Sequence, residues 1–221
     1  MVRVFIGMDQ RQPLAYTVLQ SSIIRRSTTP VQITPLLLHQ LPVERTGLTN
    51  FTFSRFVVPY LCDYEGYAVF MDADMVCLTD INELIEQAKQ SDAAVMVVKN
   101  PMRFEWTSLM VFNNAKCKDL TLDVIENGAP HELKWAGEVG ELAPEYNHLV
   151  GYDEPRDDAK IVHYTQGVPC WHETEDCEYA EEWHDEKAAA LMTCTWKGLM
   201  GNSVHAEPVL KRLFKKYMAA A

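Results

Sequence analysis

The run Tyr67-Ala68-Val69-Phe70-Met71-Asp72-Ala73-Asp74 joins an apolar segment directly to a pair of carboxylates. Its apolar residues predict a strand that is buried on both faces of a sheet. An extended chain has a period of two, so the side chains of Asp72 and Asp74 point to the same side. Open α/β sheets place ligands beyond the carboxyl ends of their central strands. The run therefore predicts two carboxylates at a ligand-binding edge.

The segments around this run alternate between strand and helix patterns. Strands are predicted at 2–6, 31–36, 67–71 and 93–98. Helices are predicted from Pro13 to about Arg25, over 51–62, and from a cap at Thr79 or Asp80 through Lys89, where Glu83 is placed for a capping box. This order predicts an α/β fold with a mostly parallel sheet and right-handed crossovers.

The chain beyond residue 100 has a less regular pattern. Strands are predicted at 108–113 and 160–164, and helices at 120–127, 177–191 and 207–218. Residues 128–159 are rich in glycine, proline and acidic residues, which predicts mostly loop. No internal repeat or long linker divides the chain. We therefore expect one domain over 1–221, which ends in a basic helix at about 206–218.

Composition excludes several classes of protein. The chain has 221 residues, a formal net charge of −11 and a pI near 5.1, which argues against a nucleic-acid partner. No apolar run approaches the roughly 20 residues that span a bilayer. The N-terminus predicts a strand rather than a signal peptide. Six scattered cysteines without a Cys-x-x-Cys pair favour the reducing cytoplasm over a disulfide scaffold.

The carboxylate pair has two interpretations. Two oxygen donors so close together repel each other unless a cation lies between them. Mg²⁺ or Mn²⁺ fits this need, because such ions are held by one or two carboxylates together with substrate phosphates. Alternatively, Asp72 and Asp74 are solvated aspartates at a loop tip, or they cap a helix. The preceding strand favours the metal.

A wider set of motifs resembles a known family. Phe70-Met71-Asp72-Ala73-Asp74-Met75-Val76 is similar to the Asp-x-Asp signature of GT-A-fold glycosyltransferases, and of family eight in particular, which includes glycogenin and bacterial lipopolysaccharide galactosyltransferases. Further segments resemble this family in the same order, over roughly residues 2–172. They are 6–9, 53–56, 80–84, 106–113, 142–147 and 161–167 with Trp171. The resemblance implies a GT-A (Rossmann-like) sheet with flanking helices.

The resemblance also implies a metal centre and a reaction. Asp74 would bind Mn²⁺ or Mg²⁺ directly, Asp72 would contact the metal and the ribose, and His163 would add a neutral ring nitrogen. Without this context, His163 is more simply a core histidine at a strand end. The implied enzyme moves a hexose from a nucleotide sugar, UDP-sugar in particular, to a sugar, glycan or glycolipid acceptor with retention of configuration. No nucleophile is assigned.

Five further residues have two interpretations each. Gly7 would let the backbone approach the ligand. Asp9 would contact uracil or ribose, or it is a turn residue. Arg55 would meet a phosphate or the sugar, or it is a solvated helix charge. Gly167 would offer its backbone to the diphosphate, or it is a turn glycine. Glu138 is the catalytic candidate on the acceptor side, or it is a solvated loop acid.

One segment departs from the family. Its members carry a phosphate-binding lysine between this glycine and Pro-Trp, whereas the chain has Gly167-Val168-Pro169-Cys170-Trp171. Either His172 takes over this contact, or the metal and the backbone hold the diphosphate without it. The missing lysine supports a second hypothesis, a non-catalytic nucleotide-sugar-binding or scaffold protein. A nucleotidyltransferase is a third, but 7–11 lacks the glycine-rich, basic loop of that class.

The C-terminal segment combines basic and aromatic residues. Lys211-Arg212-Leu213-Phe214-Lys215-Lys216-Tyr217 stands out on an acidic chain. One use for it is a peripheral contact with the inner face of a membrane. The other interpretation is a solvated helix end, where the helix dipole favours cations.

Overall fold

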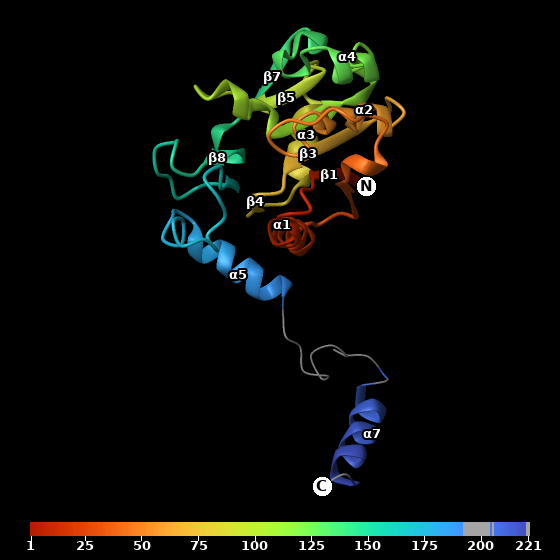
Figure 1. The fold of residues 1–221 in the computed structure, drawn as a ribbon, viewed down its shortest axis with the longest axis vertical. Coiled ribbons are helices and arrows are strands. Elements are labelled where there is room, and N and C mark those ends of the chain that lie inside the picture. The colour runs from red at the N-terminus through yellow and green to blue at the C-terminus, as the bar shows by residue number, and fades with distance from the viewer. Residues whose placement is uncertain (192–203, 205, 220–221) are drawn as a thin grey trace.

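The computed structural model describes residues 1–191, 204 and 206–219, and its centre is a six-stranded sheet (Figure 1). The strands in spatial order are β2 (Val31–Leu36), β1 (Val2–Gly7), β3 (Tyr67–Asp72), β6 (Leu109–Asn113), β5 (Val95–Val98) and β7 (Val139–Leu142). β1 pairs in parallel with β2 and β3, and β5 with β7, while β6 is antiparallel to both of its neighbours. The predicted α/β fold with a mostly parallel sheet is confirmed.

Helices and short turns connect these strands. The helices are α1 (Pro13–Arg26), α2 (Val58–Leu61), α3 (Asn82–Lys89), α4 (Leu122–Asn127), α5 (Ala180–Ala190) and α7 (Ala206–Ala219). The 3-10 turns are Leu38–Gln40, Ser54–Val57 (η2), Arg103–Thr107 (η3), Asn114–Lys116, Pro130–Glu132, Lys134–Ala136 and Pro144–Tyr146. Within the described ranges, every helix is too short or too polar to cross a membrane.

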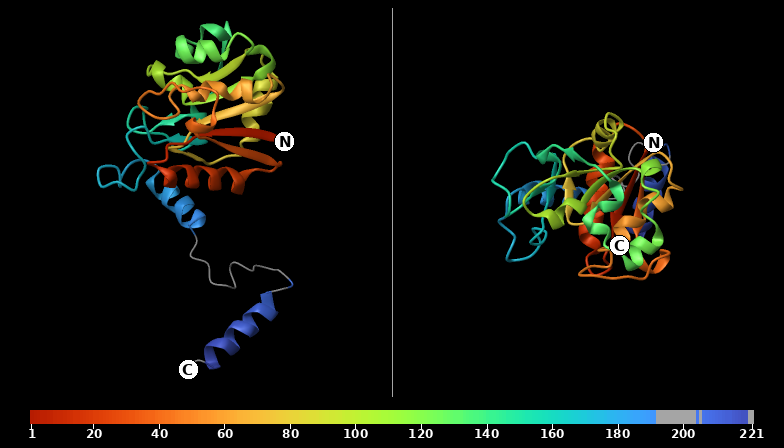
Figure 2. Two further views of the ribbon diagram at one scale, coloured as in Figure 1. Left: turned by 45° about the vertical axis from the view of Figure 1, so that its right-hand side comes forward. Right: turned by 90° about the horizontal axis from the view of Figure 1, so that it is seen from above.

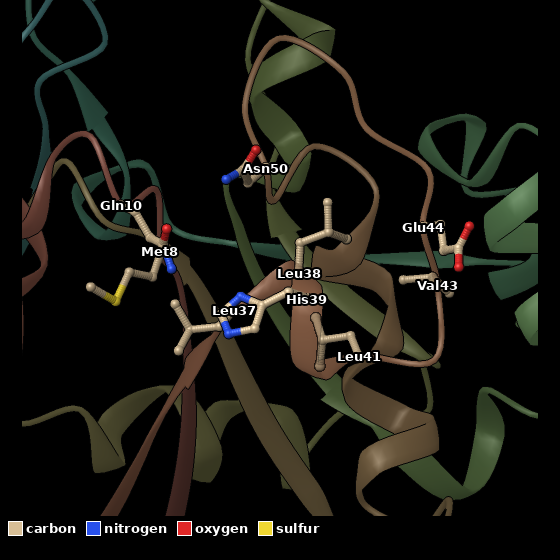
Figure 3. Close-up of a pocket in the computed structure, with 9 residues that line it drawn as sticks. All are labelled: Met8, Gln10, Leu37, Leu38, His39, Leu41, Val43, Glu44 and Asn50. Atoms are coloured by element: carbon tan, nitrogen blue, oxygen red, sulfur yellow. The ribbon is translucent and has the colours of Figure 1, made fainter.

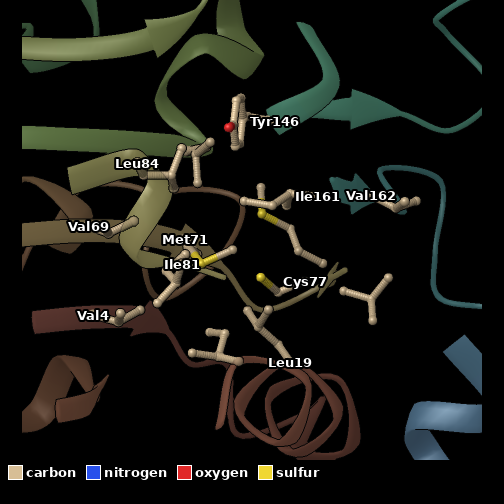
Figure 4. Packing of buried hydrophobic residues seen from close by; sticks show 14 of the residues in the cluster. Val4, Leu19, Val69, Met71, Cys77, Ile81, Leu84, Tyr146, Ile161 and Val162 are labelled. Atoms are coloured by element: carbon tan, nitrogen blue, oxygen red, sulfur yellow. The ribbon is translucent and has the colours of Figure 1, made fainter. Parts of the chain in front are cut away.

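Residues 68–71 of β3 are apolar and fully buried on both faces of the sheet. Val69 and Met71 face a cluster with α1, α3 and the small sheet described below (Figure 4). Ala68 and Phe70 face the opposite cluster, which includes residues of η2, α2 and α4. The central strand is thus held from two sides, and Asp72 ends it at a fixed position.

A second, three-stranded sheet brings distant residues to the end of β3. It consists of β4 (Met75–Cys77), β9 (Ile161–His163) and β8 (His148–Leu149). β4 pairs antiparallel with β9, with Met75 opposite His163, and the backbone N–H of Tyr164 donates to the carbonyl of Asp74 at 2.9 Å. This pairing places His163 beside the carboxylates.

Helix α5 is held against α1 by ion pairs. Glu186 on α5 is 3% exposed and accepts hydrogen bonds from Arg25 at 3.0 Å and Arg26 at 2.6 Å. α5 accordingly lies next to α1 in Figure 2. The cysteines of the described residues are free thiols, and Cys194 lies outside those residues.

Residues 128–159 are mostly loop, as predicted, but they also include the edge strand β7 as well as β8, which the sequence pattern did not indicate. Gly140 interrupts the hydrophobic pattern of β7, so this strand was not predicted. The glycine is needed for packing, because a Cβ there would lie 2.8 Å from the side chain of Met96. The helix predicted over 51–62 is a 3-10 turn that leads into the four-residue α2. A single period of hydrophobicity does not distinguish these two helical forms.

Candidate functional site

Three predicted residues meet at the carboxyl end of β3. Asp72 ends β3, Asp74 lies in the turn to β4, and His163 ends β9. Each offers one ligand atom, and these atoms all lie within 4.8 Å of one another. The Nε2 atom of His163 is 3.3 Å from Oδ1 of Asp74. These three residues were predicted from the sequence to form one group, and the structure brings them together.

The donor atoms fit a hard divalent cation. The Oδ1 atoms of Asp72 and Asp74 are buried and accept no well-aligned hydrogen bond, although Nη2 of Arg55 and Nε2 of His163 lie 3.2 and 3.3 Å from them. An unsatisfied buried carboxylate oxygen is costly, so two that converge indicate a site shaped for a positive ligand. Carboxylate oxygens with an imidazole nitrogen suit Mn²⁺ well, and the oxygens suit Mg²⁺.

Arg55 is the cation that the structure places at this cluster. It is 3% exposed, and its Nη2 donates to Asp72 at 3.2 Å. Its Nη1 donates to the carbonyl of Thr107 at 2.9 Å. Arg55 is therefore not a solvated helix charge, and it is engaged with a carboxylate.

The pKa values reflect this crowding of charge. Burial raises the pKa of Asp72 to about 7, because the Arg55 guanidinium offsets only part of the desolvation and Asp74 adds repulsion. Burial alone would lower the pKa of His163, but Asp74 and the other nearby carboxylates outweigh it and raise the pKa. Both groups thus indicate a shortage of positive charge at the site.

Glu105 is a member of the site that the sequence analysis missed. Its Oε2 lies 4.0 Å from Nδ1 of His163, and its side chain is 19% exposed. In the ionisation state that metal ligands need, with Asp72, Asp74 and Glu105 all charged and the histidine neutral, three carboxylates against one guanidinium leave two negative charges. One divalent cation balances them. In the sequence, the only indication for Glu105 was its position immediately before the 106–113 segment. The geometry of the η3 turn shows that its side chain faces His163.

Packing against Phe51 explains why residue 7 is a glycine. A Cβ there would lie 2.5 Å from Cγ of Phe51, so the aromatic ring occupies the space beside it. Gly7 also pairs with Asp72 across β1 and β3, which places the end of β1 at the candidate metal group formed by Asp72, Asp74 and His163. The backbone approach to a ligand stays a prediction.

Asp9 is buried and holds its neighbour in the turn. Its carboxylate accepts from the side chain of Arg11 at 2.5 and 2.9 Å and from the backbone N–H of Arg11 at 2.9 Å. The hydrogen bond from Arg11 is the main cause of the lowered pKa of Asp9. This is the geometry of a turn residue, and contact with uracil or ribose stays a prediction.

A pocket of about 430 Å³ opens beyond the carboxyl ends of β1 and β2 (Figure 3). Its lining combines apolar side chains with a few polar groups: Met8, Gln10, Leu37, Leu38, His39, Leu41, Val43, Glu44 and Asn50. Because β1 ends beside Asp72, the pocket lies on the metal side of the sheet. A volume of this size suits a small organic ligand.

The loop at Gly167 has an acidic surrounding. Gly167 has a φ of +118°, which strongly favours glycine. It lines a pocket of about 470 Å³ that also contains the carboxylates of Asp153, Glu173, Asp176 and Glu178, and neither lysine nor arginine lines it. His172 is exposed and paired with Glu175 at 3.0 Å. Diphosphate contacts by Gly167 or His172 therefore stay predictions, and this arrangement does not favour them.

Glu138 lies away from the metal group. It directly precedes β7, which runs parallel to β5 and hence, through the antiparallel β6, parallel to β3. Glu138 is thus at the amino end of its strand, whereas Asp72 is at the carboxyl end of β3. Its side chain is exposed and has no hydrogen bond or ion pair within residues 1–191. A catalytic role for it stays a prediction that this position disfavours.

Solved structures share this architecture. The bifunctional glycosyltransferase WbbM matches with a TM-score of 0.66 at 15% identity, over 96% of this chain and 51% of its own, so the chain spans about half the length of WbbM. A mutant of the galactosyltransferase LgtC gives 0.62 at 12%, over 89% and 99% of the two chains. GlyE from Streptococcus pneumoniae TIGR4 gives 0.61 at 16%, over 98% and 64%. These likenesses confirm the GT-A fold of the glycosyltransferases.

Sequence comparison adds a relative. No protein-family model matches the chain. Protein CDI from Arabidopsis thaliana is 34% identical, over 83% of this chain and 85% of that protein, and its name states no enzyme activity. The chain therefore belongs to the family of Protein CDI, and it is built on the GT-A glycosyltransferase fold.

Proposed function

We propose that the chain is a metal-dependent glycosyltransferase that moves a hexose from a nucleotide sugar to a sugar or glycan acceptor. The observation that carries this proposal is the convergence of Asp72, Asp74 and His163 within 4.8 Å at the carboxyl end of β3. The GT-A fold supports this proposal, because open α/β sheets bind their ligands at the carboxyl ends of their strands. Transfer with retention is part of the proposal through the resemblance to family eight.

Asp72, Asp74 and His163 would hold Mn²⁺ or Mg²⁺. The cation would stabilise the negative charge that builds on the departing nucleoside diphosphate. Arg55 keeps the Asp72 carboxylate fixed at the end of β3 through its 3.2 Å contact. Its own position is fixed by the carbonyl of Thr107, so little reorganisation is needed when the ligand binds.

The pocket of Figure 3 supports a place for the nucleoside. It adjoins the end of β1, and β1 ends opposite Asp72. Apolar walls from Leu37, Leu38 and Leu41 offer a surface for a base, while Gln10 and Asn50 offer amide groups for hydrogen bonds. UDP is the nucleotide that we propose for it. LgtC has been solved with donor and acceptor sugar analogues, which makes the same class of ligands the first choice here.

Calorimetry with UDP tests the proposal. We expect UDP to bind in the presence of Mn²⁺ and to bind far more weakly after chelation. A panel of UDP-sugars in a thermal-shift assay then identifies the donor, because a ligand stabilises the native state in proportion to the logarithm of its concentration over Kd. Slow Mn²⁺-dependent release of UDP from the best sugar would establish turnover. A protein that neither binds UDP nor releases it from any donor overturns the proposal.

The acidic pocket at Gly167 favours a second candidate function. Because neither lysine nor arginine lines this pocket, the chain would bind nucleotide sugars without transferring the sugar. The two candidates differ in one measurement, because a pure binding protein gives the Mn²⁺-dependent UDP affinity with no UDP release on addition of acceptors.

A further inference from the structure

The η3 turn has two sides with different environments. On one side, Thr107 accepts the hydrogen bond from Arg55 and Glu105 faces His163 at 4.0 Å. On the other side, Arg103 and Phe104 line a pocket of about 500 Å³ together with His131, Glu132 and Lys134. Phe104 and Glu105 are consecutive residues, so their Cα atoms are about 3.8 Å apart. The pocket and the Asp72-Asp74-His163 cluster are thus linked through the η3 turn, whose Glu105 faces His163.

The wall of this pocket is a flat aromatic surface. Phe104 is 56% exposed and stacks on His131, with ring centroids 5.7 Å apart and planes 10° from parallel. His131 is held by edge contacts to Phe53 and Phe56 at 5.2 and 4.8 Å. Burial, helped by the nearby charges of Arg45 and Arg55, lowers the pKa of His131 to about 4, so this surface is neutral at physiological pH. A flat, neutral aromatic surface suits the C–H face of a pyranose ring.

Arg103 adds an exposed positive charge that forms no direct ion pair among the described residues, although Glu132 in the same pocket lies close enough to feel its field. Its guanidinium lies 5.4 Å from the centroid of the Trp106 ring, and the indole N–H of Trp106 donates to the carbonyl of Asn100 at 2.8 Å. Lys134 is paired with Glu132, whereas Arg103 has no ion pair within the part of the chain that the structure describes. On a chain of net charge −11, this is a positioned fork for a carboxylate.

We propose that this pocket is the acceptor subsite for a glycan bearing a hexuronic acid, with its ring on Phe104 and its carboxylate on Arg103. The inference rests on the proposed glycosyltransferase function, which it deepens by naming the class of acceptor. The nucleotide belongs to the pocket at β1 and β2, so UDP and the acidic sugar occupy separate places.

A matched pair of disaccharides tests the subsite. Cellobiouronic acid and cellobiose differ only in a carboxylate that replaces one hydroxymethyl group. Ligand-observed NMR titrations of the full chain with diamagnetic Mg²⁺ and UDP should give about ten-fold tighter binding of the acidic sugar. Equal affinities for the two sugars, or weaker binding of the acidic sugar with UDP than in a second titration without UDP, overturn the subsite.

Variants assign the two contacts. Arg103→Gln should reduce the affinity for cellobiouronic acid to that for cellobiose, and Phe104→Ala should weaken both sugars. Lys118→Gln is the matched control, because Lys118 is an exposed cation beyond the carboxyl end of β6, at the opposite edge of the sheet. A preference that survives Arg103→Gln contradicts the proposal. UDP binding, measured in the same samples, shows separately whether the glycosyltransferase function stands.

Discussion

The carboxylate of Glu105 faces the Nδ1 atom of His163 at 4.0 Å, while the Nε2 atom of the same ring faces Asp74 at 3.3 Å. Nδ1 is buried and has no hydrogen-bond partner. A histidine that binds a metal through one nitrogen is generally oriented through the other, most often by a carboxylate or a carbonyl. A movement of about 1 Å would bring Glu105 to hydrogen-bond distance.

Glu105→Ala is therefore expected to lower the affinity for Mn²⁺ by about 10- to 100-fold. Calorimetric titration of the protein with Mn²⁺ alone measures this without any assay of transfer. Glu86→Ala removes an exposed carboxylate on α3 and should leave the titration unchanged. If both variants bind Mn²⁺ like the unmodified protein, Glu105 does not orient His163.

Asp74→Asn should remove metal binding and keep the fold. The Asp74 side chain is 28% exposed and its partner is His163 at 3.3 Å rather than an arginine, and an amide oxygen can still accept from the imidazole, so the replacement costs little stability. We expect Mn²⁺-dependent binding of UDP to be lost, with the free energy of unfolding changed by less than about 1 kcal/mol. Calorimetry and urea unfolding measure the two effects. Unaltered UDP affinity would exclude Asp74 as a ligand.

Asp72→Ala should behave differently, because it leaves Arg55 buried without its carboxylate. Removing one member of a buried pair costs about 3 to 5 kcal/mol. The raised pKa of Asp72 shows that the pair itself is only partly favourable, so the double variant Asp72→Ala/Arg55→Met should recover part of the loss. Urea unfolding in the absence of metal measures this. Full additivity of the two changes would mean that the pair is not coupled.

The sequence could predict the metal group for a clear reason. Asp72 and Asp74 follow an apolar strand, and the period of two and the strand end are both local properties of the chain. His163 is distant in sequence, and it was found through its motif rather than through any property of spacing. The β4–β9 pairing that brings it to Asp74 depends on three-residue strands, which carry almost no pattern of their own.

The environment of the group could not be predicted in the same way. Whether Arg55 is buried depends on the Thr107 carbonyl and on Asp72, contacts that span 52 and 17 residues. The position of Glu138 depends on β7, and Gly140 obscured that strand. The burial of Arg55 and the position of Glu138 therefore depend on long-range contacts and on an edge strand, which the local sequence pattern does not report.

Glu83 predicts how stability responds to acid. Burial alone would raise its pKa, but hydrogen bonds outweigh burial and lower the pKa to about 2. They come from Thr79 at 2.5 Å, Tyr146 at 2.7 Å and Lys160 at 2.9 Å. A lowered carboxyl pKa contributes stability that is present above the unfolded value, near 4.5, and is lost as the pH falls toward 2.

Glu83→Gln should therefore flatten the loss of stability between about pH 4.5 and pH 2. Urea midpoints at pH 7, 4 and 3, followed by tryptophan fluorescence, measure the slope. Glu86→Gln lies one helical turn away with an exposed side chain and should keep the original slope. Parallel curves for the Glu83 variant and the unmodified protein would show that these hydrogen bonds do not survive in solution.

Gly7→Ala separates a packing role from a ligand role. The added Cβ would lie 2.5 Å from the Phe51 ring, which is 6% exposed and cannot move freely, so we expect a loss of about 1 to 3 kcal/mol. Phe51→Leu also destabilises the protein, but it makes room, and the double variant should be more stable than the sum of the single changes predicts. Urea unfolding of the four proteins gives this coupling. If Gly7→Ala instead keeps its stability and loses UDP affinity, the glycine serves the approach of the ligand, because the strain against Phe51 would then be absent.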